Sequence, residues 1–207
     1  MTLRERIAFF LQKIVDKLLF DVPVMDTSDE NGNTQRAKTI LIKDTMVETI
    51  PDGIYIGGWL DFGYSRVKEL PQTIRAKKGV ILTNSLITSL PDGFFCEGSV
   101  ILSGSQIEEL PERIIVGKDL VLSKSLIKEV PEGLVVGRNL DISESNVEYL
   151  PPNFTVGGDL IMRNAKVREL PRNLTVGGNL VLSDSGITDI PETTFVGFRI
   201  QTKDSNK

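Results

Sequence analysis

The side chains of this chain that could carry out chemistry are one cysteine and a column of serines. Histidine is absent from all 207 residues, which removes the most common general base and the most common metal ligand. Cys96 is the only cysteine, so no internal disulfide framework can form, and we expect a small buried apolar role for it. The serines recur every 20 residues without a base to activate them, so we interpret them as structural. This column consists of Thr45, Ser65, Ser85, Ser105, Ser125, Ser145, Ala165 and Ser185.

Carboxylates are spread through the chain and do not gather in compact groups. They form columns with one residue per repeat, such as Glu109 and Glu129, which gives no loop of ligands for calcium. With 24 basic and 28 acidic residues, the chain has no general attraction to nucleic acid or to an anionic membrane. We therefore expect no enzyme activity, no cofactor, no metal site and no nucleic-acid partner.

A repeat of 20 residues organises the chain, because a proline recurs at that interval from Pro51 to Pro191. In each repeat two inward apolar residues flank an outward one, as in Leu120-Val121-Leu122, and this period of two predicts a short strand. Stacked strands would form a parallel sheet with one strand per coil. Each proline forces its predecessor to be extended and makes a corner, after which a second short extended piece is expected. The pattern predicts a mostly β repeat solenoid.

The residues of one repeat match a known motif. Leu180, Leu182, Ile187, Ile190 and Pro191 occur at the spacing LxxLxLxxNxL followed by a Leu-Pro step, with serine in place of the usual asparagine. This pattern resembles the leucine-rich repeat family, and eight consecutive copies are similar to the short repeats of bacterial and bacteriophage proteins. The resemblance implies an α/β-type, right-handed solenoid whose parallel sheet contacts partners through its concave strand face.

The chain divides into three parts on this interpretation. Residues 1–22 are expected to form an amphipathic helix, because a capping box and apolar residues at helical spacing occur there. Residues 23–37 are polar and are expected to form a linker, and residues 38–207 contain about eight coils of 20 residues. The helix would cap the open edge of the solenoid, or alternatively bind a partner or a membrane surface.

The expected location is the cytoplasm of a bacterium or of an infected cell. No apolar run is long enough to cross a bilayer, and the N-terminal segment is a poor signal peptide because charges interrupt it and no small-residue cleavage site follows. A membrane partner is therefore not expected, with the N-terminal helix as the exception. Delivery to a host cell or a place in a virion remains as the alternative.

The outward residues of the predicted strands are the candidate binding site for a protein partner. Eight coils at about 4.8 Å would make a face about 38 Å long, and an apolar stripe of this length is typical of an interface. The same stripe would also arise because β-branched residues favour strands. The predicted partner-binding residues are Trp59, Asp61, Ile81, Ile101, Val121, Asp141, Ile161 and Val181.

A structural or assembly protein is the alternative function. Such a protein would self-associate through its apolar face or through the open edge of its last coil. A second outward column on the other extended piece offers another apolar surface for contact or for the N-terminal helix. This column includes Tyr55, Phe95, Ile115, Val135 and Phe195.

Overall fold

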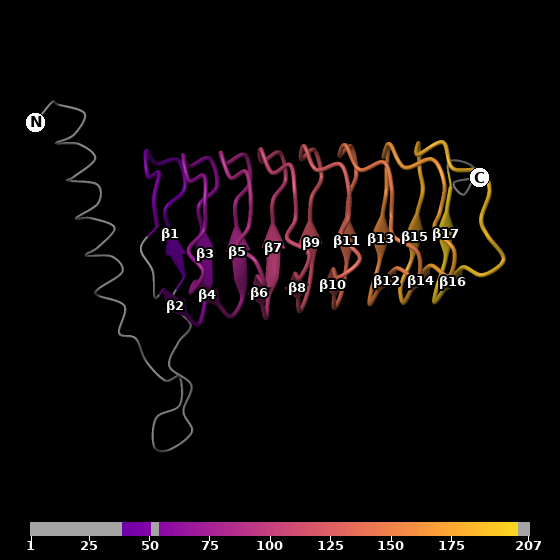
Figure 1. Cartoon of the computed structure of the whole chain (residues 1–207), viewed down its shortest axis with the longest axis horizontal. Coiled ribbons are helices and arrows are strands. Elements are labelled where there is room, and N and C mark those ends of the chain that lie inside the picture. The colour runs from indigo at the N-terminus through magenta and orange to yellow at the C-terminus, as the bar shows by residue number, and fades with distance from the viewer. Residues whose placement is uncertain (1–38, 51–53, 203–207) are drawn as a thin grey trace, which may run out of the picture.

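The computed structural model describes residues 39–50 and 54–202, so the predicted helix at 1–22 and the linker at 23–37 lie outside the described residues. The described part is a solenoid whose coils stand side by side in a nearly straight row (Figure 1). Every strand pair is parallel, and the described residues contain no helix. The prediction of a mostly β repeat solenoid with a parallel sheet is therefore confirmed.

The main sheet contains nine strands, one from each successive coil, in the order of the chain. Each paired residue lies 20 positions after its partner, as in Val121 with Asp141, so equivalent residues form straight columns across the sheet. The strands are β1 (Ile40–Leu41), β3 (Trp59–Asp61), β5 (Gly79–Ile81), β7 (Ser99–Ile101), β9 (Leu120–Val121), β11 (Leu140–Asp141), β13 (Leu160–Ile161), β15 (Leu180–Val181) and β17 (Ile200–Gln201).

The second extended piece of each coil forms a second row of strands that is divided in two. One part has six strands and the other pairs only β2 with β4. At the break, the Arg75 guanidinium donates a hydrogen bond of 2.8 Å to the carbonyl of Ile74, whereas the equivalent carbonyl of Phe94 accepts the N–H of Ile115 in the next coil. The strands are β2 (Tyr55–Ile56), β4 (Arg75–Ala76), β6 (Phe95–Cys96), β8 (Ile115–Val116), β10 (Val135–Val136), β12 (Thr155–Val156), β14 (Thr175–Val176) and β16 (Phe195–Val196).

The core lies between the two rows of strands and the proline corners. Its columns are apolar and closed to solvent, as at Leu120, Leu122 and Ile127. Cys96 belongs to this core, and burial raises the pKa of its thiol while a backbone hydrogen bond from Gly98 opposes the shift. The thiol therefore stays protonated at neutral pH and is a poor nucleophile. The buried apolar role expected for Cys96 is confirmed.

The serine column closes the bend that follows each main strand. Six hydroxyls of the column, including that of Thr45, donate to the carbonyl three residues earlier at 2.7 to 2.8 Å, as Ser125 does to Leu122. Three of the oxygens also accept the backbone N–H two residues later, as Ser145 does from Val147. These hydroxyls hold their own bends, so the structural interpretation of these serines is confirmed.

Ser125→Ala is expected to lower the free energy of unfolding by about 1 kcal/mol, because a buried hydrogen bond is lost. Ala165 supplies the reverse experiment, since it is buried in the same column and the Met162 carbonyl lies at the equivalent position. Ala165→Ser is therefore expected to raise stability by a similar amount. Urea denaturation followed by circular dichroism measures both changes. Equal effects of the two variants in the same direction would contradict a hydrogen-bonding role for the column.

A second column of turn residues gives no clear sign in the sequence. The second residue of the turn that follows each of the main strands β1 to β15 adopts a positive φ. These residues include the bulky Tyr64 at 56° and Lys124 at 59°. Such a φ is uncommon outside glycine, asparagine and aspartate. The stacked coils therefore impose this conformation on Tyr64, Lys124 and Glu144, whose residue types do not favour it. The column is Asp44, Tyr64, Asn84, Gly104, Lys124, Glu144, Asn164 and Asp184.

Candidate functional site

The outward residues of the main sheet form one continuous surface, which we call the strand face. It consists of Leu41, Asp61, Ile81, Ile101, Val121, Asp141, Ile161, Val181 and Gln201. The predicted residues from Asp61 to Ile161 are half-buried, because each side chain rests against its neighbours 20 positions away. Their predicted outward position is confirmed, and the face is rigid because hydrogen-bonded strands carry it.

Val181 differs from its predicted exposure, because only 5% of its surface is accessible. It lies in register between Ile161 and Gln201 on the two neighbouring strands. A short β-branched side chain between two longer ones keeps little accessible surface. The prediction that Val181 is an exposed contact residue is therefore wrong.

Trp59 stands at the N-terminal side of the strand face and is half-buried. Its ring occupies the space above the neighbouring strand, because a Cβ placed on Gly79 would lie 2.5 Å from the ring atom Cζ3. Gly79 and Ser99, which follow in the same column, are both buried. The indole therefore packs across β5 and borders the strand face, and only part of its surface is open to a partner.

Two carboxylates interrupt the apolar row of the strand face. Asp61 accepts a hydrogen bond of 2.9 Å from the N–H of Gly63, and Asp141 accepts one of the same length from the N–H of Ser143. Each aspartate thus holds the bend that follows its own strand. The continuous apolar surface between them is reduced to the side chains of three neighbouring strands, which we call the aliphatic patch. The aliphatic patch is Ile81, Ile101 and Val121.

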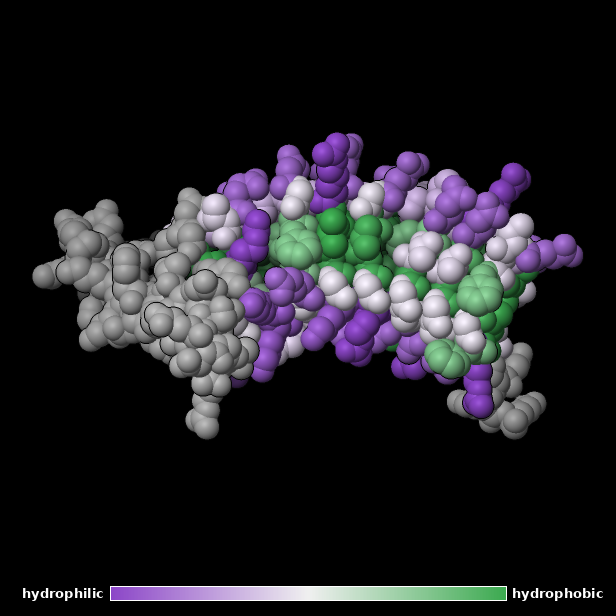
Figure 2. Space-filling model, turned by 90° about the horizontal axis from the view of Figure 1, so that it is seen from below, coloured by the Kyte–Doolittle hydropathy of each residue, from purple (hydrophilic) through white to green (hydrophobic). Residues whose placement is uncertain are grey.

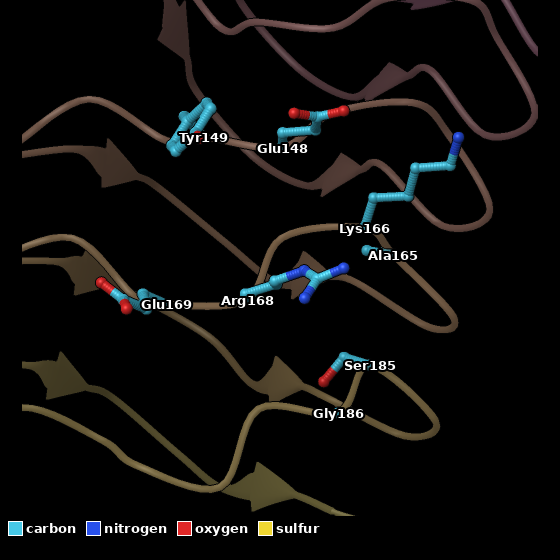
Figure 3. Close-up of a pocket in the computed structure, with 8 residues that line it drawn as sticks. All are labelled: Glu148, Tyr149, Ala165, Lys166, Arg168, Glu169, Ser185 and Gly186. Carbon is cyan, nitrogen blue, oxygen red and sulfur yellow. The ribbon is translucent and has the colours of Figure 1, made fainter.

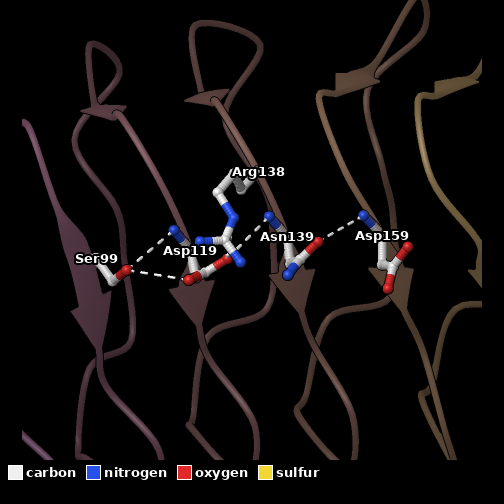
Figure 4. A network of polar contacts seen from close by, with 5 residues as sticks. All are labelled: Ser99, Asp119, Arg138, Asn139 and Asp159. Carbon is white, nitrogen blue, oxygen red and sulfur yellow. Dashed lines mark hydrogen bonds and ion pairs between the residues drawn. The ribbon is translucent and has the colours of Figure 1, made fainter.

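A ladder of polar side chains runs along one flank of the strand face (Figure 4). The Asn139 side chain accepts the N–H of Asp159 at 2.7 Å, and Asp159 in turn accepts the N–H of Asn179 at 2.7 Å. The ladder begins at Ser99, whose hydroxyl donates to Asp119 at 3.1 Å, and Arg138 lies 3.5 Å from the same carboxylate. These side chains join each coil to the next. This role was not predicted, although the Asn or Asp that recurs at this position in four successive coils is a usable signal in the sequence.

A hollow with a volume of about 790 Å³ lies on another side of the coils (Figure 3). Lys166 and Arg168 extend toward one side of it and Glu169 toward the other. The Ser185 hydroxyl at its wall already donates to the Leu182 carbonyl and accepts the N–H of Ile187. The hollow therefore contains charges of both signs but no nucleophile with a base beside it.

Two further apolar surfaces are exposed. On the second row of strands, Phe95, Ile115 and Val135 project outward, and Figure 2 shows hydrophobic side chains gathered in the middle of that side of the molecule. At the last coil, Phe198 is 77% exposed and Ile200 is 38% exposed. Ile200 continues a column whose members in the preceding coils, such as Leu180, are fully buried. The last described coil therefore exposes an apolar position that is buried in the preceding coils.

The described residues contain no group of three or more acidic or cysteine side chains placed to hold a metal ion. Within residues 39–50 and 54–202 there is also no helix that is long and apolar enough to cross a membrane. No family model, curated protein or solved structure matches the chain.

Proposed function

We propose that this chain is a non-enzymatic protein-binding module that contacts its partner through the strand face. The observation that carries the proposal is the aliphatic patch, in which Ile81, Ile101 and Val121 stand half-exposed on three adjacent strands. Apolar side chains gathered at the centre of a surface and bordered by polar ones are typical of protein interfaces. The resemblance to leucine-rich repeats supports the same face.

The rigidity of the strand face favours binding. Strands β5, β7 and β9 are each paired on both sides, so the patch does not have to be ordered when a partner arrives. Binding to a preformed surface avoids part of the entropic cost of association. The small residues Thr83, Ser103 and Ser123 border the patch and leave the aliphatic side chains accessible.

The proposed location is a reducing cytoplasm, either that of a bacterium or that of an infected cell. The single cysteine is buried and has no disulfide partner, which suits such a compartment. The proposal requires a protein partner, whose identity is unknown, and it requires no cofactor.

Replacing Ile101 and Val121 together by lysine is expected to abolish capture of the partner from a lysate of the source cell. Lysine can keep its aliphatic stem on the sheet and its ammonium in water, so the fold should persist. The matched control replaces Ile115 and Val135, which are exposed on the second row of strands, by lysine. Affinity capture measures binding, and circular dichroism with urea denaturation measures folding. Equal capture by the strand-face variant and the wild type would contradict the proposal.

Self-association is a second candidate function, favoured by the uncovered last coil. Phe195, Phe198 and Ile200 are exposed there beside β16 and β17, which are the outermost strands of their sheets in the described part of the chain. Stacking of a second copy on this edge would cover them and continue the sheets.

Phe198→Asp is then expected to shift the protein toward the monomer, because the charge would be buried in the contact between copies. Sedimentation equilibrium at several protein concentrations measures this change. Phe95→Asp is the control, since Phe95 is exposed far from the last coil. A wild-type protein that stays monomeric at all concentrations would exclude this candidate.

A further inference from the structure

We propose that the partner places an amphipathic α-helix along the solenoid axis on the aliphatic patch, with one basic residue at each end of the contact. This inference rests on the proposed function of the strand face and names the chemistry of the partner. It derives from two features of the face, namely the spacing of its columns and the two carboxylates at its ends.

The spacing of the patch fits a helix better than a strand. The outward residues of neighbouring strands are about 4.8 Å apart, and a helix that lies across the strands repeats its face every turn of about 5.4 Å. In an extended peptide that runs in the same direction, side chains on one face are about 6.8 Å apart. A helix therefore stays in step with Ile81, Ile101 and Val121, whereas an extended segment loses register by the third strand.

The carboxylates mark the two ends of the contact. Asp61 and Asp141 lie four strands apart on the strand face, which is about 19 Å at the usual spacing. The hydrogen bonds from Gly63 and Ser143 fix one oxygen of each carboxylate toward its own bend. Among the described residues neither carboxylate has an ion-pair partner, in contrast to Asp119, which lies beside Arg138. The fixed and unpaired charges favour a cationic partner.

These distances define the sequence pattern of the partner. Two basic residues about 14 positions apart lie on one side of a helix, with about 21 Å between them along its axis. Their long side chains can bend to bring the two charged groups to the distance between Asp61 and Asp141. Apolar residues about 4, 7 and 11 positions after the first basic residue share that side. They rise by about 6, 10.5 and 16.5 Å, close to the aliphatic patch at about 4.8, 9.6 and 14.4 Å from Asp61.

The cations near this face lie in the columns beside it. Arg138 is engaged with Asp119, and Lys43, Lys78, Lys118 and Arg163 stand on the flanks outside the aliphatic patch. Asp159 adds a further negative charge on the ladder side. The strand face itself carries two carboxylates and no cation, so the attraction for a basic helix is confined to the two ends of the aliphatic patch.

The test uses the full chain and a designed helical peptide of roughly 18 residues that carries this pattern with lysine and leucine in an alanine-glutamine background. A matched peptide has glutamate in place of both lysines. Fluorescence anisotropy at two salt concentrations measures binding of each peptide to the wild type and to the variants Asp61→Asn and Asp141→Asn. Asparagine keeps the side-chain oxygen that accepts the Gly63 or Ser143 N–H, so each variant removes the charge and retains the bend.

Saturable binding is expected for the lysine peptide and not for the glutamate peptide. Each asparagine variant should weaken binding of the lysine peptide by about three- to fivefold and reduce the salt dependence of that binding. The control Asp92→Asn, at an exposed proline corner, should leave binding unchanged. Ile101→Lys should abolish binding of the peptide.

The outcomes separate this inference from the proposed function. If a natural partner is lost on replacing Ile101 and Val121 but the lysine peptide does not bind, or binds equally to the aspartate variants, the helical partner is excluded and the binding face stands. If the natural partner is retained by the strand-face variant, both proposals fail.

Discussion

Gly157→Ala is expected to lower the free energy of unfolding by about 3 kcal/mol or more, at the upper end of the usual cost of overpacking. A Cβ added to Gly157 would lie 2.2 Å from the carbonyl oxygen of Gly137 in the preceding coil. The obstacle is backbone and not a flexible side chain, so the two coils would have to move apart. Urea denaturation followed by circular dichroism measures the loss.

Gly186→Ala is the matched control for this prediction. Gly186 has a φ of 78°, but no atom lies within 4 Å of an added Cβ, so only the conformational cost of about 1 kcal/mol applies. Equal losses for the two variants would show that the close approach of the coils does not explain the glycine. The column of close approach consists of Gly117, Gly137, Gly157, Gly177 and Gly197, which follow five of the six strands in the continuous part of the second row.

Leu140→Ala is expected to lower stability by about 2–5 kcal/mol, because it leaves a cavity in the fully buried core of a central coil. Ile200→Ala at the equivalent position of the last coil should cost less than about 1 kcal/mol, since Ile200 is already 38% exposed. Calorimetry and urea denaturation measure both variants. In a solenoid each coil contacts only its neighbours, so weakening a central coil should also make the two halves unfold less cooperatively.

A reduced urea dependence of the unfolding free energy would report this loss of cooperativity. A single transition with an unchanged urea dependence for Leu140→Ala would instead show that the stack unfolds as one unit. Losses of similar size for Leu140→Ala and Ile200→Ala would contradict the difference in burial between the two coils.

The strands and corners could be predicted from the sequence because each coil repeats the same pattern of burial. Leu120 and Leu122 alternate with Val121, and the serines recur at one place, so periodicity and side-chain chemistry pointed to the same structure. The positive φ of Tyr64 and Lys124 could not be predicted, because neither residue type favours it. The stack imposes that turn, and only the glycine, asparagine and aspartate members of the column give a local hint of it.

The candidate site could be predicted only in its outline. The outward direction of Ile81, Ile101 and Val121 follows from the alternation along each strand. The burial of Val181 and the packing of Trp59 across Gly79 depend on neighbours 20 residues away. The alternation within one coil gives no information on the sizes of those neighbours. Contacts between coils therefore decide which part of the predicted face is open.

The constant register of the main sheet has a consequence for how such a chain can change in evolution. Because every strand residue pairs with the residue 20 positions away, one repeat can be duplicated or deleted in the gene while the remaining coils keep equivalent neighbours. Each such event would lengthen or shorten the row by one strand, or about 4.8 Å. Recombination between Asp61 and Asp141 would change the distance between these carboxylates in equal steps, and with it the length of the helical partner that we propose for the strand face.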